Sequence, residues 1–113
     1  MEDKPDIIEL IGIKKTRPIL SCVRHHVEKW IERQQSLLFY PNRSFYRVVI
    51  THEKDSPIFT CELQVNIGHI RWTGCESGKT IQDSLGRTLA HLRSNPPPGF
   101  TRFKPSQAAH VAA

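Results

Sequence analysis

The sequence contains no apolar run that approaches the roughly 18–20 residues needed to span a bilayer. Residues 1–6 are acidic, whereas a signal peptide would begin with a basic segment followed by an apolar one. Both absences exclude the usual sequence signals of membrane insertion and export. We therefore expect a soluble, cytoplasmic protein with no membrane partner, and its 113 residues have the size of one domain.

Cysteine is also scarce. There are three, an odd number in a chain without an export signal, so we expect no disulfide framework. Cys22, His25 and His26 have the spacing of metal ligands on one helical turn, but no fourth ligand is placed to join them. We expect Cys22 and Cys61 to be small apolar fillers of the core, and we predict no metal and no other cofactor.

Acidic residues are in the minority, with 11 Asp and Glu against 16 Lys and Arg, which gives a formal net charge of +5. This balance first suggests a polyanionic partner. However, Glu28, Glu32, Glu76 and Asp83 accompany the cations of the two predicted helices. A mixed charged face is often only a solvated surface, so charge alone leaves nucleic-acid binding and simple solvation both open.

Hydrophobic periodicity predicts six elements along the chain. Strands are expected over residues 7–13, 45–51, 59–67 and from residue 70, with helices from Thr16 to about Leu38 and from Glu76 to Arg93. The order β-α-β-β-β-α predicts an α+β two-layer sandwich, in which two helices cover one face of a mainly antiparallel sheet. Residues 1–94 form the domain in this interpretation, and residues 95–113 form a Pro-rich flexible tail.

The clearest pattern is the strict alternation of apolar and polar residues from Phe59 to Ile67, which is typical of a strand with one buried face. Gly68-His69 then suits a two-residue turn. This turn fixes the register of the next strand, with the pairs Ile67–Ile70, Val65–Trp72 and Leu63–Gly74 on the core face. The same register sends Cys61 inward and Cys75 outward, beside Glu62.

The segment from Gly74 to Thr80 looks like a phosphate-binding loop but is one residue short, because Thr73 stands where the first glycine should be. We interpret it as a strand-to-helix turn with a capped helix start. No Asp or Asn is placed to orient a Cys-His pair, and no Gly-rich loop offers an oxyanion hole. We therefore expect no enzymatic activity and no small-molecule substrate.

Several strings of residues follow one another from about Ile7 to Leu92: a first strand leading into Thr16-x-x-Ile19-x-x-x-Val23, the segment Val48-Val49-Ile50-Thr51, the alternating strand, the glycine turn, and a helix with Ile81, Leu85 and Leu92. Their order and spacing resemble the ribosome hibernation factors, a family of ribosome-associated inhibitor and hibernation-promoting proteins once called sigma-54 modulation proteins. The resemblance is to the short form of the family. It implies a fold akin to double-stranded-RNA-binding domains, which occupies the mRNA and tRNA channel of the small ribosomal subunit and silences translation under stress or in stationary phase.

The resemblance also implies that basic side chains on both helices contact 16S rRNA. His26 and Lys29 fall at basic positions of the family's first helix, and Arg87 falls at one on the second. Glu32, Ala90 and Ser94 depart from the family's basic pattern, and Arg33 and Arg93 lie one residue away and can compensate in part. The predicted rRNA-binding residues are His26, Lys29, Arg33, Lys79, Arg87 and Arg93. Off the ribosome, we expect a monomer.

A second hypothesis comes from the expected polar face of the sheet. A non-catalytic protein-interaction module would use that face to bind another protein instead of rRNA. Its predicted residues are Thr60, Glu62, Gln64, Asn66, Arg71 and Thr73.

Overall fold

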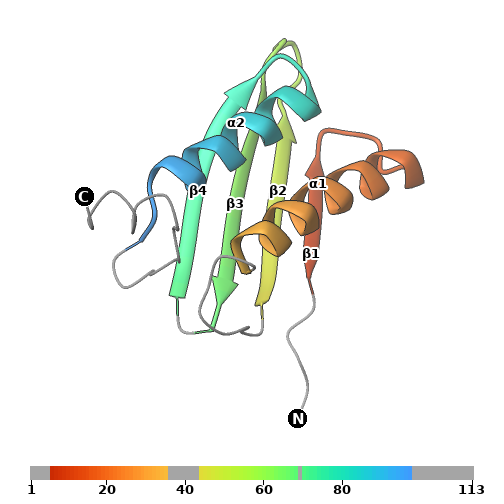
Figure 1. Cartoon of the computed structure of the whole chain (residues 1–113). Coiled ribbons are helices and arrows are strands. Elements are labelled where there is room, and N and C mark those ends of the chain that lie inside the picture. The colour runs from red at the N-terminus through yellow and green to blue at the C-terminus, as the bar shows by residue number, and fades with distance from the viewer. Residues whose placement is uncertain (1–5, 36–43, 69, 98–113) are drawn as a thin grey trace, which may run out of the picture.

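The computed structural model describes residues 6–35, 44–68 and 70–97 of the chain. It contains, in order, β1 (Ile7–Ile11), α1 (Arg17–Gln35), β2 (Ser44–His52), β3 (Phe59–Ile67), β4 (Ile70–Gly78) and α2 (Ile81–Ser94). The strands form one sheet in the order β1-β2-β3-β4, and both helices lie on the same face of it (Figure 1). The predicted β-α-β-β-β-α fold and its two-layer architecture are therefore confirmed.

The sheet is mixed, because β1 runs parallel to β2 while the other two pairs are antiparallel. A parallel pair needs a crossover connection, and α1 supplies it. The predicted first strand extended to Ile13 but ends at Ile11, since Gly12 turns the backbone with a positive φ of 72°. A Cβ atom at Gly12 would collide with the backbone carbonyl of His52, so this turn requires glycine.

The register of β3 against β4 is the predicted one, with all three expected residue pairs present. Cys61 is fully buried, whereas Cys75 is exposed and lies opposite Glu62, also as predicted. Gly68 has a φ of 61°, which suits the glycine of a tight hairpin turn. Its predicted partner in the turn, His69, lies outside the described residues.

The first helix begins where the sequence predicts. Thr16 precedes it, and its hydroxyl oxygen accepts a hydrogen bond from the backbone N–H of Ile19 at 3.4 Å. Pro18 occupies the first turn, where a missing N–H costs little. The helix continues to Gln35, and its predicted end near Leu38 lies outside the described residues.

The predicted start of the second helix at Glu76 is wrong, because β4 continues to Gly78 and α2 begins only at Ile81. Pairing with β3 holds this segment extended, and the side chains of Thr60 and Ser77 hydrogen-bond across the two strands at 3.2 Å. Thr80 is the N-cap of α2, since its hydroxyl oxygen accepts from the backbone N–H of Asp83 at 2.9 Å. The helix start was therefore expected five residues too early.

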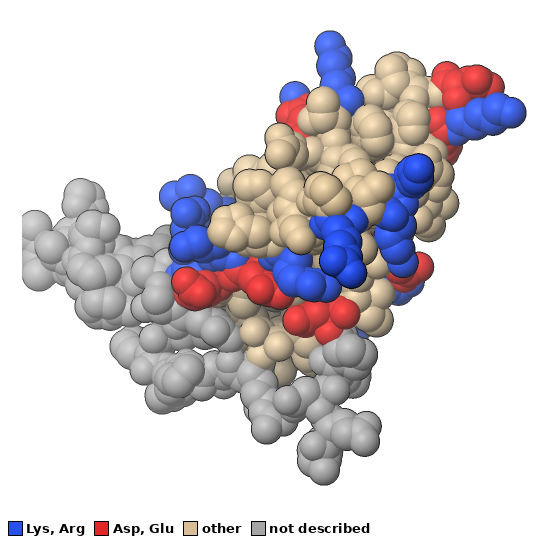
Figure 2. Space-filling view, turned by 90° about the vertical axis from the view of Figure 1, so that its right-hand side faces the viewer, with Lys and Arg blue, Asp and Glu red and all other residues tan. Residues whose placement is uncertain are grey.

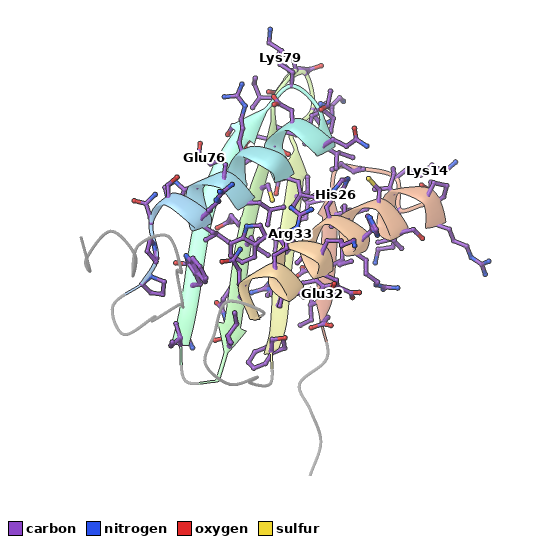
Figure 3. The ribbon with its side chains drawn as sticks, in the orientation of Figure 1. Lys14, His26, Glu32, Arg33, Glu76 and Lys79 are labelled. Carbon is purple, nitrogen blue, oxygen red and sulfur yellow. The ribbon has the colours of Figure 1, made fainter. Side chains whose placement is uncertain are left out.

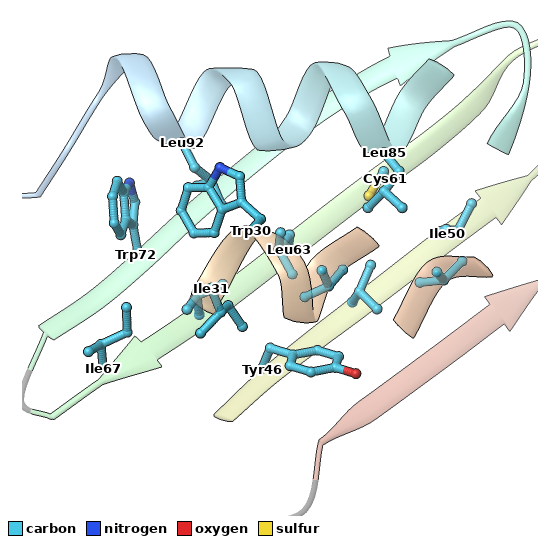
Figure 4. Packing of buried hydrophobic residues seen from close by; sticks show 14 residues of the cluster. Trp30, Ile31, Tyr46, Ile50, Cys61, Leu63, Ile67, Trp72, Leu85 and Leu92 are labelled. Carbon is cyan, nitrogen blue, oxygen red and sulfur yellow. The ribbon is translucent and has the colours of Figure 1, made fainter. Parts of the chain in front are cut away.

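The core fills the space between the helix layer and the sheet (Figure 4). Trp30 of α1 and Trp72 of β4 meet edge to face, with ring centroids 4.9 Å apart. Cys61 is one of the buried apolar side chains, as expected for a small filler. The buried apolar residues of the helices are Val23, Val27, Trp30 and Ile31 on α1 and Leu85 and Leu92 on α2. None of the helices in the described ranges is both long and apolar enough to cross a membrane.

Candidate nucleic-acid interface

Three of the six predicted rRNA-binding residues lie on one flank of α1. His26, Lys29 and Arg33 are four, seven and eleven residues after Cys22, so helical geometry places all three on the same side as Cys22. That side adjoins α2, because the side-chain amide of Gln82 donates a hydrogen bond to the Cys22 sulfur at 3.4 Å. His26, Lys29 and Arg33 are all exposed, and Figure 3 shows His26 and Arg33 on the edge of α1 nearest α2.

Arg93 extends this group from the other helix. It is exposed and lies eleven residues after Gln82, so the two residues share one flank of α2. His26, Lys29, Arg33 and Arg93 therefore border the line where the helices adjoin, and we call these four residues the seam group. All four residues are exposed on the helix layer of the molecule.

Arg87 is not part of the seam group. It is five residues after Gln82 and therefore lies on a different flank of α2. Its Nε atom donates to Asp83 Oδ1 at 3.1 Å, and Asp83 Oδ2 accepts from the backbone N–H of Lys79 at 3.1 Å. The hydrogen bond from Lys79, together with the Arg87 guanidinium, lowers the pKa of Asp83. The carboxylate offsets part of the positive charge around Lys79 and Arg87, both of which are exposed.

Three further cations, which the resemblance did not indicate, stand at the start of α1. Lys14, Lys15 and Arg17 are all exposed, and within the described residues none of them makes an ion pair with a carboxylate. We call these three residues the helix-start cluster, and Figure 3 shows Lys14 at the beginning of α1. The sequence carried a signal for it, because residues 12–27 contain four Lys or Arg and no Asp or Glu.

The opposite end of α1 carries carboxylates beside its cations. Glu28 Oε2 accepts from the Tyr46 hydroxyl at 3.2 Å, and Asp6 accepts from the Tyr46 backbone N–H at 3.0 Å. Burial, with the nearby carboxylates of Glu28 and Asp6, raises the pKa of Tyr46 to about 12. A hollow of about 240 Å³ here is lined by Asp6, Glu28, Ile31, Glu32, Ser44 and Tyr46. On this side of the molecule, acidic side chains lie below the cations of the helix layer (Figure 2).

The face of the sheet away from the helices is less polar than predicted. Ile7 and Ile11 of β1 are 40% and 50% exposed there, and Asn66, expected to face solvent, is buried. Arg47 pairs with Glu9 at 2.6 Å across β1 and β2. A shallow hollow of about 640 Å³ lies over this face, lined by Glu9, Ile11, Arg47, Val49, Glu62, Leu63, Gln64, Thr73, Gly74 and Cys75.

Neither the phosphate-loop pattern nor the metal pattern forms a site in the described residues. Gly74 to Gly78 belong to β4, so the segment interpreted as a turn is mostly strand. The Cys22 sulfur accepts a hydrogen bond from Gln82, and the described part of the chain brings together no group of three or more metal-ligating side chains.

No protein-family model and no curated protein matches this chain. Solved structures do. The N-terminal domain of Protein Y from Thermus thermophilus superposes with a TM-score of 0.62 at 16% sequence identity, covering 81% of this chain and 93% of that one. A ribosomal subunit interface protein from Coxiella burnetii superposes with a TM-score of 0.52 at 9% identity, covering 95% of this chain and 99% of that one. The fold is therefore the one that the resemblance to ribosome hibernation factors predicted.

Proposed function

We propose that this protein binds the small ribosomal subunit through the cations of its helix layer and silences translation by occupying the mRNA and tRNA channel. The observation that supports this most is the match of the whole β-α-β-β-β-α domain to proteins that include a ribosomal subunit interface protein. The protein acts in the cytoplasm as a monomer when it is off the ribosome, and it makes or breaks no bond.

The seam group supplies the chemistry that such binding needs. Lys and Arg neutralise phosphates without reading bases, and folded rRNA presents phosphates in a fixed shape more than a free sequence. His26, Lys29, Arg33 and Arg93 lie on two helices whose apolar faces are packed against the sheet, so the backbone that carries them is already ordered before binding. Lys79 and Arg87 form a second contact beside Asp83.

Sedimentation with purified ribosomal particles tests the proposal. The protein is mixed with 30S subunits or 70S ribosomes at about 0.1 M salt and centrifuged through sucrose, and an unrelated basic protein of similar size serves as the control. We expect co-migration with 30S and 70S particles, and loss of protein synthesis in a cell-free translation reaction. Residence only at the top of the gradient would contradict ribosome binding, and binding without inhibition would contradict the silencing role.

The open face of the sheet favours a second candidate, a protein-interaction module. The 640 Å³ hollow and the exposed Ile7 and Ile11 make this face large enough and apolar enough to contact a protein. A Gln64→Lys substitution places a new charge in that hollow. Under the ribosome proposal this change leaves 30S binding unaltered, whereas a protein partner on this face would be lost.

A further inference from the structure

The helix-start cluster is held in place from both sides. Gly12 turns the chain directly against the backbone of His52, at the end of β2. Ile13 packs against the core, and the hydroxyl of Thr16 caps α1. Lys14 and Lys15 lie between these anchors with their side chains in solvent. The backbone that carries the cluster is therefore fixed by contacts that do not involve its charges.

No side chain of the cluster shares its charge with a carboxylate in the described part of the chain. By contrast, Arg47 is paired with Glu9, and Arg87 is paired with Asp83. An exposed cation without a carboxylate partner needs no exchange of an internal ion pair before it contacts a phosphate. Each such contact also releases counterions condensed on the nucleic acid, which favours binding at low salt.

The distribution of acid along α1 favours the same end. Both carboxylates of the helix, Glu28 and Glu32, lie in its second half, where Asp6 adds a third beside Tyr46. These carboxylates offset the positive charges of Lys29 and Arg33 in the same half of the helix, whereas the helix start carries positive charge alone. A phosphate chain lying along α1 is therefore attracted most strongly at the helix start.

We propose that the helix-start cluster of Lys14, Lys15 and Arg17 is the main phosphate-binding surface of this protein for RNA, ahead of the seam group. The choice of RNA as the polyanion rests on the proposed function. Placing the main contact in the connection between β1 and α1 does not, because it follows from the anchored backbone, the unpaired cations and the acid-free stretch of residues 12–27.

The test uses the full chain, a labelled 20-base-pair RNA duplex and purified 30S subunits. The variant K14Q/K15Q removes two charges from the cluster. The control K54Q/R71Q removes the same number from exposed positions in the β2–β3 turn and on β4. Circular dichroism confirms that both variants fold.

We expect K14Q/K15Q to lower duplex affinity about tenfold, and to reduce the slope of log affinity against log salt by about 1.4–1.8, which is two phosphate contacts. The control should change affinity less than threefold. Equal losses in the two variants, or no loss in K14Q/K15Q, would overturn the inference, as would a wild-type protein that does not bind the duplex.

The 30S arm separates this inference from the proposed function. If duplex binding depends on the cluster but neither the wild type nor any variant binds 30S, the cluster is an RNA-binding surface and the ribosome proposal is wrong. If 30S binding survives K14Q/K15Q unchanged and is lost in K29Q/R33Q, the ribosome proposal stands and the cluster is not the main contact.

Discussion

At the scale of single residues, the two cysteines of the β3–β4 pair provide a test of the strand register. Cys61 is fully buried, and burial raises the pKa of its thiol to about 11. Cys75 is exposed on the other face of the sheet. At pH 8 we expect an alkylating reagent to modify Cys75 in the native protein and to reach Cys61 only after unfolding, as read by mass spectrometry of the intact chain and its peptides. A stoichiometric Cys61–Cys75 disulfide in the native monomer would contradict the register.

Asp83 is a second residue whose ionisation is tied to the fold. The backbone N–H of Lys79, followed by the Arg87 guanidinium, holds the pKa of Asp83 below its ordinary value of 3.8. A carboxyl whose pKa is lower in the folded chain stabilises the protein above the pKa of the unfolded chain, and this contribution is lost as the pH falls through the folded pKa. We therefore expect Asp83→Asn to destabilise the protein at pH 7, and to do so less at a pH well below 3.8, such as pH 2.

Urea unfolding at the two pH values measures this difference. Asp55→Asn in the β2–β3 turn is the matched control, since Asp55 has a positive φ of 67° that asparagine also accepts. An Asp83→Asn penalty that is equal at both pH values would mean that the carboxylate charge contributes nothing and only its shape matters.

At the scale of the elements, the cations of the two helices differ in their surroundings. Lys29 is exposed in the seam group, whereas Arg87 lies on another flank of α2 and already shares its charge with Asp83. We expect Lys29→Ala to weaken 30S binding and to reduce the salt slope by about 0.7–0.9, with a smaller effect for Arg87→Ala. Both exposed substitutions should change stability by less than about 0.5 kcal/mol.

Glu32→Lys is the complementary change on α1. It removes a carboxylate from the second half of the helix and restores the basic position of the family, so 30S binding should become tighter and steeper in salt. If Lys29→Ala and Arg87→Ala weaken binding equally, the distinction between the two flanks is irrelevant to the ribosome.

The register of β3 against β4 was predictable because alternation and a two-residue turn leave one arrangement that buries Leu63, Val65 and Trp72 together. The start of α2 was not, since Gly74 and Gly78 resemble a loop in sequence and are extended only because β3 pairs with them. A strand partner is a long-range cause that local propensity does not contain.

The residues of the candidate interface were also predictable only in part. The sequence identified the exposed cations of both helices, because their positions between the apolar residues already imply a solvent face. It did not separate Arg87 from the seam group, since that depends on which flank of α2 adjoins α1. The helix-start cluster was missed because family positions guided the choice, although the acid-free stretch of residues 12–27 was visible.

At the scale of the whole molecule, the absence of a nucleotide loop has a thermodynamic consequence. Residues 74–78 are extended as part of β4, so their backbone N–H groups point alternately to opposite sides of the strand and do not converge on a phosphate. A ligand at 100 times its dissociation constant would stabilise the fold by about 2.7 kcal/mol. We expect millimolar ATP or GTP with magnesium to leave the melting temperature unchanged in a thermal scan, and a rise of several degrees would reopen the nucleotide-binding interpretation.

The contact between Trp30 and Trp72 determines what the protein's own fluorescence can report. These are the two tryptophans of the chain, and both indoles are buried at one point where α1 meets β4. The indole N–H of Trp72 also donates to the backbone carbonyl of Asn95, just beyond α2. All tryptophan emission therefore arises from a single junction of the helix layer with the sheet. A red shift of this emission during unfolding reports that the two layers have separated and exposed the indoles to water. Because neither indole belongs to a surface proposed to bind RNA, binding titrations require an external label.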